Sequence, residues 1–99
     1  MAKLYITEYG ATITPSAPDL VAEPAITDQT PVTYSTSTQS AAFSNLTTVV
    51  RLHTDSICSI AFGTNPTATT NNRRMAANQT EYFVVPQGQS YKVAAVTNT

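Results

Sequence analysis

Short runs in which apolar and polar residues alternate constrain this chain more than any other feature. Near the start, Leu4 and Ile6 alternate with Tyr5, Thr7 and Tyr9. Successive side chains of a β-strand point to opposite faces, so such a run predicts a strand with one buried face. No segment repeats apolar residues at i, i+3, i+4 and i+7 over three turns, as an amphipathic helix would. The pattern predicts an all-β fold.

Further strands are expected at 31–37, 41–43, 48–54, 57–62, 82–85 and 91–96. The sequence VPQG at 85–88 places Pro second and Gly fourth, as type I turns prefer, so the last two strands are expected to form a hairpin. Residues 63–80 carry Gly, Asn and Pro at turn positions and are expected to form a loop. Together these signals predict one small antiparallel β-sandwich over residues 1–99, with jelly-roll, immunoglobulin-like and partial-barrel strand orders all open.

Residues 10–31 interrupt the strand pattern with four of the chain's six prolines. Proline lacks the amide donor and restricts the residue before it, so this stretch is expected to be extended and irregular. A loop of about twenty residues without secondary structure is uncommon unless it has a role. Its apolar residues Leu20, Val21 and Ile26 suggest contact with another surface. We expect an arm that either covers the sandwich or reaches a neighbouring molecule.

Charge and composition exclude several classes of partner. The formal net charge is −1 and only 11% of residues are charged, so the basic stripe that holds nucleic acid is absent from the sequence. The sequence also lacks a basic amphipathic face, an apolar run of about 18 residues and the apolar core of a signal peptide. We therefore expect a protein made in a cytoplasm, with neither nucleic acid nor membrane as a partner. Its single cysteine excludes an intrachain disulfide.

The stretch RLHTDSICSIAF at 51–62 brings His53, Asp55 and Cys58 close together in sequence, as a catalytic set would. The alternation of side chains between the two faces of a strand argues against this reading. Matching the apolar face of Val50 and Leu52 to that of Cys58 requires a connection with an odd number of residues, and it leaves His53 on the other face. A buried thiol behaves as a small hydrophobe, and Asp55 is interpreted as a turn residue. We expect no catalytic, cofactor or metal site, no small-molecule substrate and no enzymatic activity.

Two further sets of residues are candidates for binding. Arg73 and Arg74 could clamp a carboxylate or phosphate, or simply be solvated in a polar loop. The tyrosines could form a platform for stacking sugars or bases, or could cap the core. A small carbohydrate-binding module therefore stays open as an alternative, and it requires an exposed platform. The five tyrosines are Tyr5, Tyr9, Tyr34, Tyr82 and Tyr91.

The order of features after residue 41 resembles small structural proteins of tailed-bacteriophage virions, of the head decoration or cement type. A strand ends in Asp, a Cys-bearing strand ends in Phe-Gly, and NPTAT precedes a basic loop. NQTEYF then leads into a Pro/Gly turn and a final Val-rich strand, and the chain begins MAKLYITEYG, as open reading frames of this kind often do.

The resemblance implies a β-sandwich subunit that binds the outer capsid surface and stabilises the head, often as a dimer or trimer. Its partners would be the major capsid protein and copies of itself, and its location the virion, after synthesis in the host cytoplasm. A neck, tail or fibre-base component is the alternative within the virion. The residues expected to contact partners are Tyr5, Tyr9, Leu20, Val21, Ile26, Arg73 and Arg74.

Overall fold

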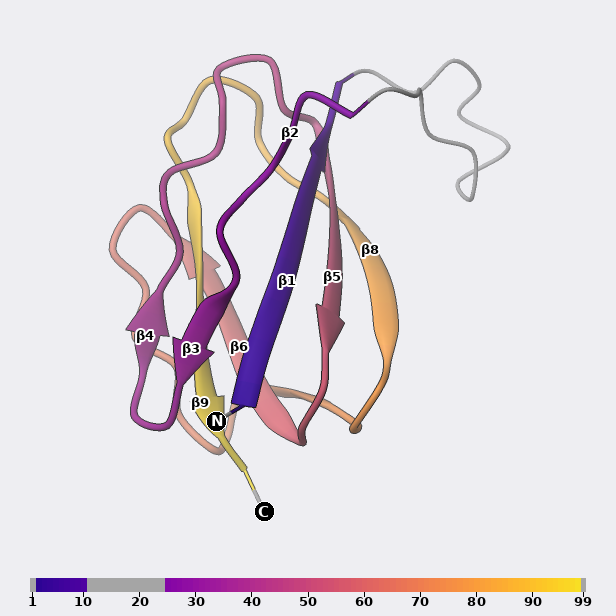
Figure 1. The fold of residues 1–99 in the computed structure, drawn as a ribbon. Coiled ribbons are helices and arrows are strands. Elements are labelled where there is room, and N and C mark those ends of the chain that lie inside the picture. The colour runs from indigo at the N-terminus through magenta and orange to yellow at the C-terminus, as the bar shows by residue number, and fades with distance from the viewer. Residues whose placement is uncertain (1, 11–24, 99) are drawn as a thin grey trace.

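The computed structural model describes residues 2–10 and 25–98, which form two antiparallel sheets packed face to face (Figure 1). The first sheet has the order β2-β1-β5-β8, and β3 pairs with the same edge of β1 as β2 does. Its strands are β1 (Ala2–Tyr9), β2 (Thr27–Asp28), β3 (Val32–Tyr34), β5 (Val49–Thr54) and β8 (Thr80–Val84). The second sheet, β4-β9-β6-β7, contains β4 (Thr38–Gln39), β6 (Cys58–Gly63), β7 (Arg73–Met75) and β9 (Lys92–Thr97). The predicted β-sandwich is confirmed.

The strand order distinguishes among the predicted architectures. The chain crosses from one sheet to the other after β3, β4, β5, β7 and β8, and of the connections from β3 onward only that between β6 and β7 stays within a sheet. A five-strand and a four-strand sheet joined by repeated crossings resemble a jelly roll more than an immunoglobulin-like sandwich, which keeps more successive strands in one sheet. The central position between β5 and the β2/β3 edge is held by β1, the first strand of the chain.

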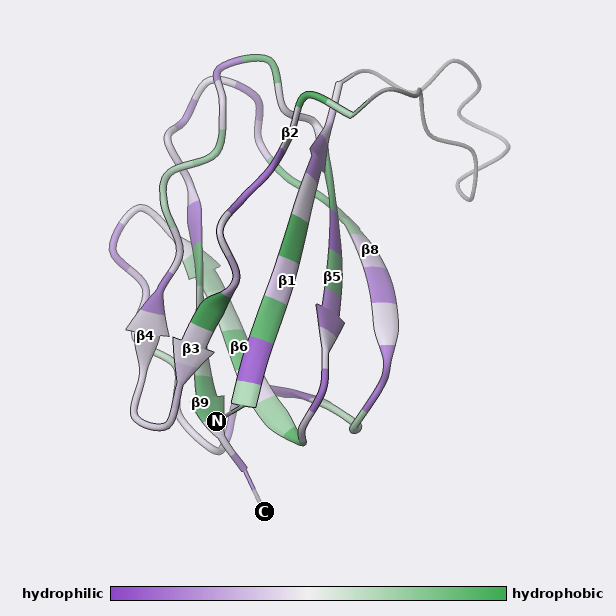
Figure 2. Ribbon diagram, in the orientation of Figure 1, coloured by the Kyte–Doolittle hydropathy of each residue, from purple (hydrophilic) through white to green (hydrophobic). Residues whose placement is uncertain are grey.

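The core lies between the inward faces of the two sheets, and the hydropathy bands along β1 follow the alternation read from the sequence (Figure 2). Burying one large aliphatic side chain in such a core contributes roughly 1.5–3 kcal/mol to stability. The first sheet supplies Leu4, Ile6, Val50 and Leu52, and the second supplies Cys58, Ile60, Met75 and Val93. The strands predicted from alternation at 3–9 and 48–54 are therefore confirmed, and Leu4, Ile6, Val50 and Leu52 lie on the buried face. At the end of the sandwich where β1 ends and β5 begins, Tyr9 and Val49 are buried as well, although alternation places them on the opposite face.

The pairing expected between residues 48–54 and 57–62 is wrong. β5 lies in the first sheet and β6 in the second, and residues 55–57 carry the chain across. The apolar faces of the two strands still meet, but across the core rather than side by side. Cys58 is consequently fully buried, as expected, while His53 lies on the outer face of the first sheet. Parity determines the face of a side chain and carries no information about which strand is its neighbour.

The hairpin expected near the C-terminal end is also wrong, since β8 and β9 belong to different sheets. Residues 85–91 cross between them, and Gly88 adopts a φ of +73°, which glycine tolerates without a steric penalty. Residues 41–43 form no strand, although Phe43 N donates a 2.8 Å bond to Tyr91 O. The loop expected at 63–80 contains the short strand β7, which pairs with β6.

Part of the predicted arm belongs to the sandwich. Ile26 N donates to Glu8 O at 2.8 Å, and β2 continues this pairing along the edge of β1. Residues 25–31 thus extend the first sheet. Residues 11–24, with the predicted contact residues Leu20 and Val21, lie outside the described residues.

Candidate functional site

The outer faces of the two sheets differ in how they are covered. Across the second sheet, the segment at 64–72 packs over the strands, and Gln39 Nε2 and Asn98 Nδ2 donate to its backbone carbonyls at 2.9 and 3.3 Å. Ser59, which faces this segment, is fully buried. On the first sheet, by contrast, the outward side chains of Tyr5 and Tyr82 are 40% and 41% exposed. The first sheet therefore presents the accessible face.

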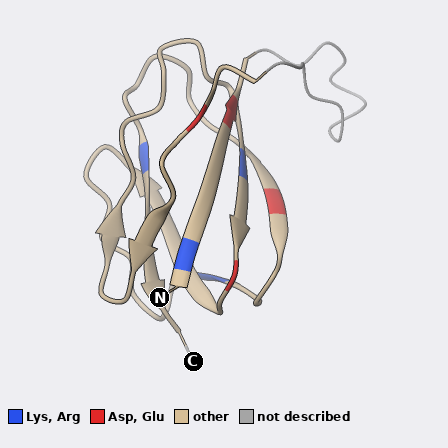
Figure 3. Ribbon diagram, viewed as in Figure 1, with Lys and Arg blue, Asp and Glu red and all other residues tan. Residues whose placement is uncertain are grey.

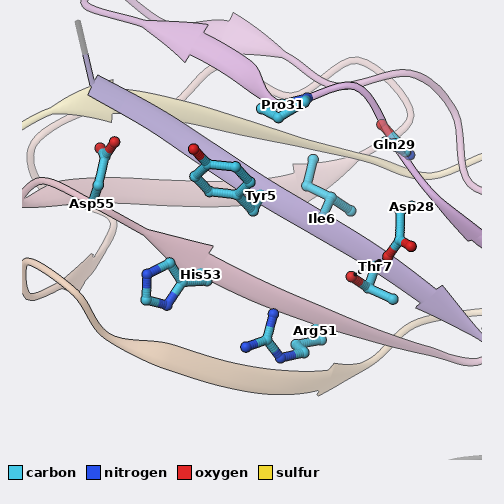
Figure 4. A pocket seen from close by; sticks show the side chains of 9 residues that line it. All are labelled: Tyr5, Ile6, Thr7, Asp28, Gln29, Pro31, Arg51, His53 and Asp55. Atoms are coloured by element: carbon cyan, nitrogen blue, oxygen red, sulfur yellow. Dashed lines mark hydrogen bonds between the residues drawn. The ribbon is translucent and has the colours of Figure 1, made fainter.

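A depression of about 660 Å³ lies on this face, within the range of volumes common for ligand sites (Figure 4). It forms where the edge of β1 is least covered. Along that edge, the pairing with β3 ends at Leu4 and the pairing with β2 starts only at Thr7. Between them Pro31 has no amide to donate, and only Gln29 N bonds to the edge, at Ile6 O. The lining consists of Tyr5, Ile6, Thr7, Asp28, Gln29, Pro31, Arg51, His53 and Asp55.

An aromatic pair forms one side of the depression. Tyr5 and His53 are directly opposed on β1 and β5, with ring centroids 6.2 Å apart and planes tilted by 54°. Thr80 Oγ1, on the next strand, lies 2.7 Å from His53 Nδ1 and so fixes the imidazole ring. The other imidazole nitrogen of His53, Nε2, has no partner among the described residues and can bond to a ligand or to water. The pair offers a half-exposed apolar surface with a polar atom at its edge.

Arg51 lies at the centre of the face, opposite Thr7 on β1 and Tyr82 on β8. Within residues 2–10 and 25–98 its guanidinium forms no hydrogen bond or ion pair, and Figure 4 shows it beside His53. A guanidinium carries five N–H donors in a fixed plane. Arg51 can therefore donate to a ligand without first breaking a bond inside the protein.

Two carboxylates flank the depression, and each is held by one oxygen. Asp28 Oδ1 accepts a 2.7 Å bond from Thr7 Oγ1, and Asp55 Oδ1 accepts a 2.8 Å bond from Lys3 N. Asp55, interpreted from sequence as a local turn residue, thus ties the β5–β6 connection to β1 instead. The Oδ2 atoms of both carboxylates remain available as acceptors among the described residues. The lining therefore combines one positive charge, on Arg51, with two negative ones, and Figure 3 marks the charged positions along the strands.

The tyrosine platform proposed from sequence is not present in that form. Tyr9 and Tyr34 are buried, and the Tyr34 hydroxyl lies inside the sandwich, 2.6 Å from Thr54 Oγ1. Tyr5 and Tyr82 do reach the accessible face, on β1 and β8. Tyr34 occupies an inward position on β3, so its hydroxyl must find partners within the protein.

The remaining candidate contact residues lie away from the depression. Arg73 and Arg74 are exposed on β7 of the second sheet rather than in a loop, and Arg73 Cζ lies 5.2 Å from the ring centroid of Phe83. Ile26 precedes β2 and is 38% exposed. The structure thus brings none of these three side chains to the site that contains Tyr5.

The Cys/His/Asp set is divided by the fold. His53 and Asp55 both line the depression, whereas Cys58 lies in the core behind the sheet. A buried thiol on the far side of β5 cannot act together with that imidazole on a bound substrate. Within the described ranges, no group of three or more His, Cys, Asp or Glu side chains could hold a metal ion. Those ranges also contain no helix long and apolar enough to cross a membrane.

Sequence reasoning missed two residues that shape this site. Arg51 lies two residues before His53 on the same strand, so alternation predicted that it points outward, but that its guanidinium has no partner among the described residues depends on the whole fold. Asp28 reaches the site only because residues 25–31 return to β1. Sequence reasoning also missed Glu8, outside the site. It lies on the same face of β1 as Leu4 and Ile6, so alternation would have predicted a buried carboxylate.

Comparison with known proteins gave no match to a protein-family model, to a curated protein or to a solved structure.

Proposed function

We propose that this chain is a structural protein of a tailed-bacteriophage virion, a decoration or cement subunit that binds the major capsid protein and copies of itself on the outer capsid surface. The support is the sequence resemblance together with an apolar rim formed by Ile26, Leu46 and Val84. These three side chains are 38%, 65% and 85% exposed. Apolar side chains clustered on a protein surface commonly mark contacts with other proteins.

The apolar rim is the observation that carries this proposal, because its members converge at one end of the sandwich. A Cβ placed at Gly10 would lie 3.7 Å from Ile26 Cδ1 and 3.9 Å from Leu46 O. Val84 lies at the same end, since Val85 N donates to Thr48 O at 2.8 Å. This is the upper end in Figure 1, where residues 10 and 25 adjoin the sandwich. The rim and the predicted arm would therefore meet the same partner surface.

Weak contacts suffice for such a role. On a capsid, identical subunits face identical sites, and linked contacts gain from effective concentration rather than from one strong interface. The rim supplies a small apolar area on each copy, and residues 11–24 would add the reach. In this proposal the sandwich is the rigid body that carries the apolar rim and residues 11–24.

The rim is tested with charged substitutions. The double variant Leu46→Lys with Val84→Lys is expected to lower occupancy on mature heads of the encoding phage at least tenfold, measured by co-sedimentation and quantitative mass spectrometry. Ala77→Lys is the matched control, because Ala77 is exposed in the turn before β8, at the other end of that strand. Wild-type protein absent from purified virions would reject the proposal. Its presence only in detached necks or tails would assign it to those components instead.

The arm is tested by a deletion that the register makes feasible. Because Glu8 O accepts a hydrogen bond from Ile26 N, residues 10 and 25 adjoin just beyond the paired ends of β1 and β2. An Asn-Gly turn can therefore replace residues 11–24. The shortened protein is expected to keep its thermal unfolding temperature within a few degrees and to bind heads more weakly. Undiminished saturation of heads by the shortened protein would show that this segment has no role in attachment.

A further inference from the structure

We propose that the depression on the first sheet is a binding site for a neutral saccharide, with Tyr5 and His53 forming its apolar wall and Arg51, Asp28 and Asp55 its hydrogen-bonding groups. This inference does not depend on the proposed virion role. It rests on three properties of the described residues: a half-exposed aromatic pair, polar atoms that lack partners, and a balance of charge.

The aromatic pair suits the apolar face of a sugar ring. A pyranose presents C–H groups on one face and hydroxyls around its edge, and an aromatic side chain offers a large, rigid contact surface at low entropic cost. Tyr5 is held against His53 at 6.2 Å, and His53 is fixed in turn by Thr80 at 2.7 Å. The wall is therefore formed before any ligand binds.

The unpartnered polar atoms supply both donors and acceptors, as a polyol requires. Each sugar hydroxyl can donate one hydrogen bond and accept others. Arg51 offers donors, while the Oδ2 atoms of Asp28 and Asp55 offer acceptors, and bonds to charged groups are the stronger ones. The side chain of Gln29 takes no part, because its Nε2 is committed to Glu8 Oε2 and its Oε1 to Ala41 N.

The balance of charge argues for a neutral ligand. Arg51, Asp28 and Asp55 line the depression, and the exposed Lys3 lies two residues before Tyr5 on the same face of β1, so this face carries two positive and two negative charges. An anionic ligand drawn to Arg51 would meet two carboxylates, and a cation drawn to these carboxylates would meet the guanidinium. Like-charge contacts of this kind penalise the wrong ligand. A neutral polyhydroxylated ring satisfies the same groups without that penalty.

The depression is open, so affinity at a single site is expected to be modest, with a Kd on the order of 1 mM. The full-length chain is screened on an array of neutral oligosaccharides built from glucose, galactose, mannose or N-acetylglucosamine, with matched uronic-acid glycans alongside. The best binder is then titrated by two-dimensional NMR. Shifted amides are expected on β1, on β5 and near Asp28.

Variants assign the contact groups. Tyr5→Thr removes the ring while keeping a strand-forming residue, and Arg51→Ala removes the donors; each is expected to weaken binding of the selected oligosaccharide at least tenfold. Arg74→Ala, which removes an exposed arginine from the second sheet, is expected to change the Kd less than twofold. Thermal unfolding of each variant shows whether it has folded, and Asp28→Asn, which keeps an oxygen for Thr7, is the milder variant.

Four results would overturn the inference. The first two concern the array: no neutral oligosaccharide binds at 10 mM, about ten times the expected Kd, or only uronic-acid glycans bind. The third is a set of chemical-shift changes that map outside the first sheet. The fourth is unchanged affinity in folded Tyr5→Thr and Arg51→Ala proteins. The NMR mapping decides the location even if a variant fails to fold. None of these results bears on attachment through the apolar rim, so the two proposals fail separately.

Discussion

Gln29 Nε2 donates a 2.8 Å hydrogen bond to Oε2 of Glu8, a carboxylate that is only 2% exposed. The other oxygen of Glu8 accepts 2.7 Å bonds from Ser44 N and from Thr47 Oγ1. One buried carboxylate thus joins β1, the segment between β2 and β3, and the 40–48 connection at the end of the sandwich that carries the apolar rim. Buried charge is tolerated here because every bond it receives comes from a well-placed donor.

Replacing Glu8 should therefore be costly. Glu8→Ala leaves three donors without their acceptor, and we expect the free energy of unfolding to fall by about 2–4 kcal/mol. Chemical denaturation monitored by circular dichroism measures this change. Asp28→Asn, an exposed acidic position, is the control and should change stability by less than about 0.5 kcal/mol. A loss of that small size at Glu8 would contradict the structural role given to its carboxylate.

Thr48→Val should stabilise the protein. Thr48 Oγ1 is buried and has no hydrogen-bond partner within the described residues. An unpaired buried hydroxyl costs about 1–3 kcal/mol by mutational measures, and valine has nearly the same shape and the same β-branching. We expect a gain of about 0.5–1.5 kcal/mol in denaturation experiments. A destabilised valine variant would mean that the hydroxyl is paired after all.

Cys58 should be protected from modification in the native state. Its side chain is fully buried between the sheets. We expect a thiol reagent such as dithionitrobenzoate to label it only as fast as the protein opens, with a rate that rises with denaturant. Cys58→Ala should cost on the order of 1 kcal/mol through lost packing. Complete labelling within seconds in native buffer would place the sulphur at the surface and revive its role as a nucleophile.

Stability should fall at high pH because of Tyr34. Burial raises the pKa of its hydroxyl to about 12 from 10.0, and the neighbouring Thr54 only partly offsets this. Between pH 10 and 12 the unfolded chain would release the Tyr34 proton while the folded chain keeps it, so the unfolded state binds fewer protons. Stability then falls with rising pH, by up to about 1.4 kcal/mol per pH unit.

This contribution of Tyr34 can be separated from that of other groups that titrate in the same window by comparison with Tyr34→Phe. The phenylalanine variant should be less stable at neutral pH by about 1 kcal/mol, because a buried hydrogen bond is lost. The gap between the two proteins should narrow from pH 10 upward. Denaturation curves at several pH values measure it, and a gap that does not change with pH would contradict the prediction.

Arg73 and Arg74 should differ although they are adjacent. The Arg73 guanidinium lies over the ring of Phe83, and the ring centroids of Phe83 and Phe62 are 5.2 Å apart. We expect Arg73→Ala to cost about 0.5–1 kcal/mol, and Arg74→Ala close to nothing, in thermal or chemical unfolding. Equal effects at both positions would show that the stacking contributes nothing measurable.

The local period of the sequence determined which residues form the main strands and which of their faces is buried. Leu4 and Ile6 point inward because side chains of any extended chain alternate between two faces, and burying the apolar one is favourable wherever that strand sits. The same reasoning separated Cys58 from His53 correctly. These conclusions held because they depend on neighbouring residues alone.

Only the tertiary structure decided which sheet each strand joins and what lies beside it. The apolar face of a strand is buried equally well whether the next strand along the chain pairs with it or lies across the core from it. Alternation therefore could not show that residues 55–57 and 85–91 cross between the sheets. The site depends on these choices. Arg51 and Asp28 line the same depression because residues 25–31 return to the edge of β1. That pairing is settled by hydrogen bonds between segments far apart in the chain, which no local pattern encodes.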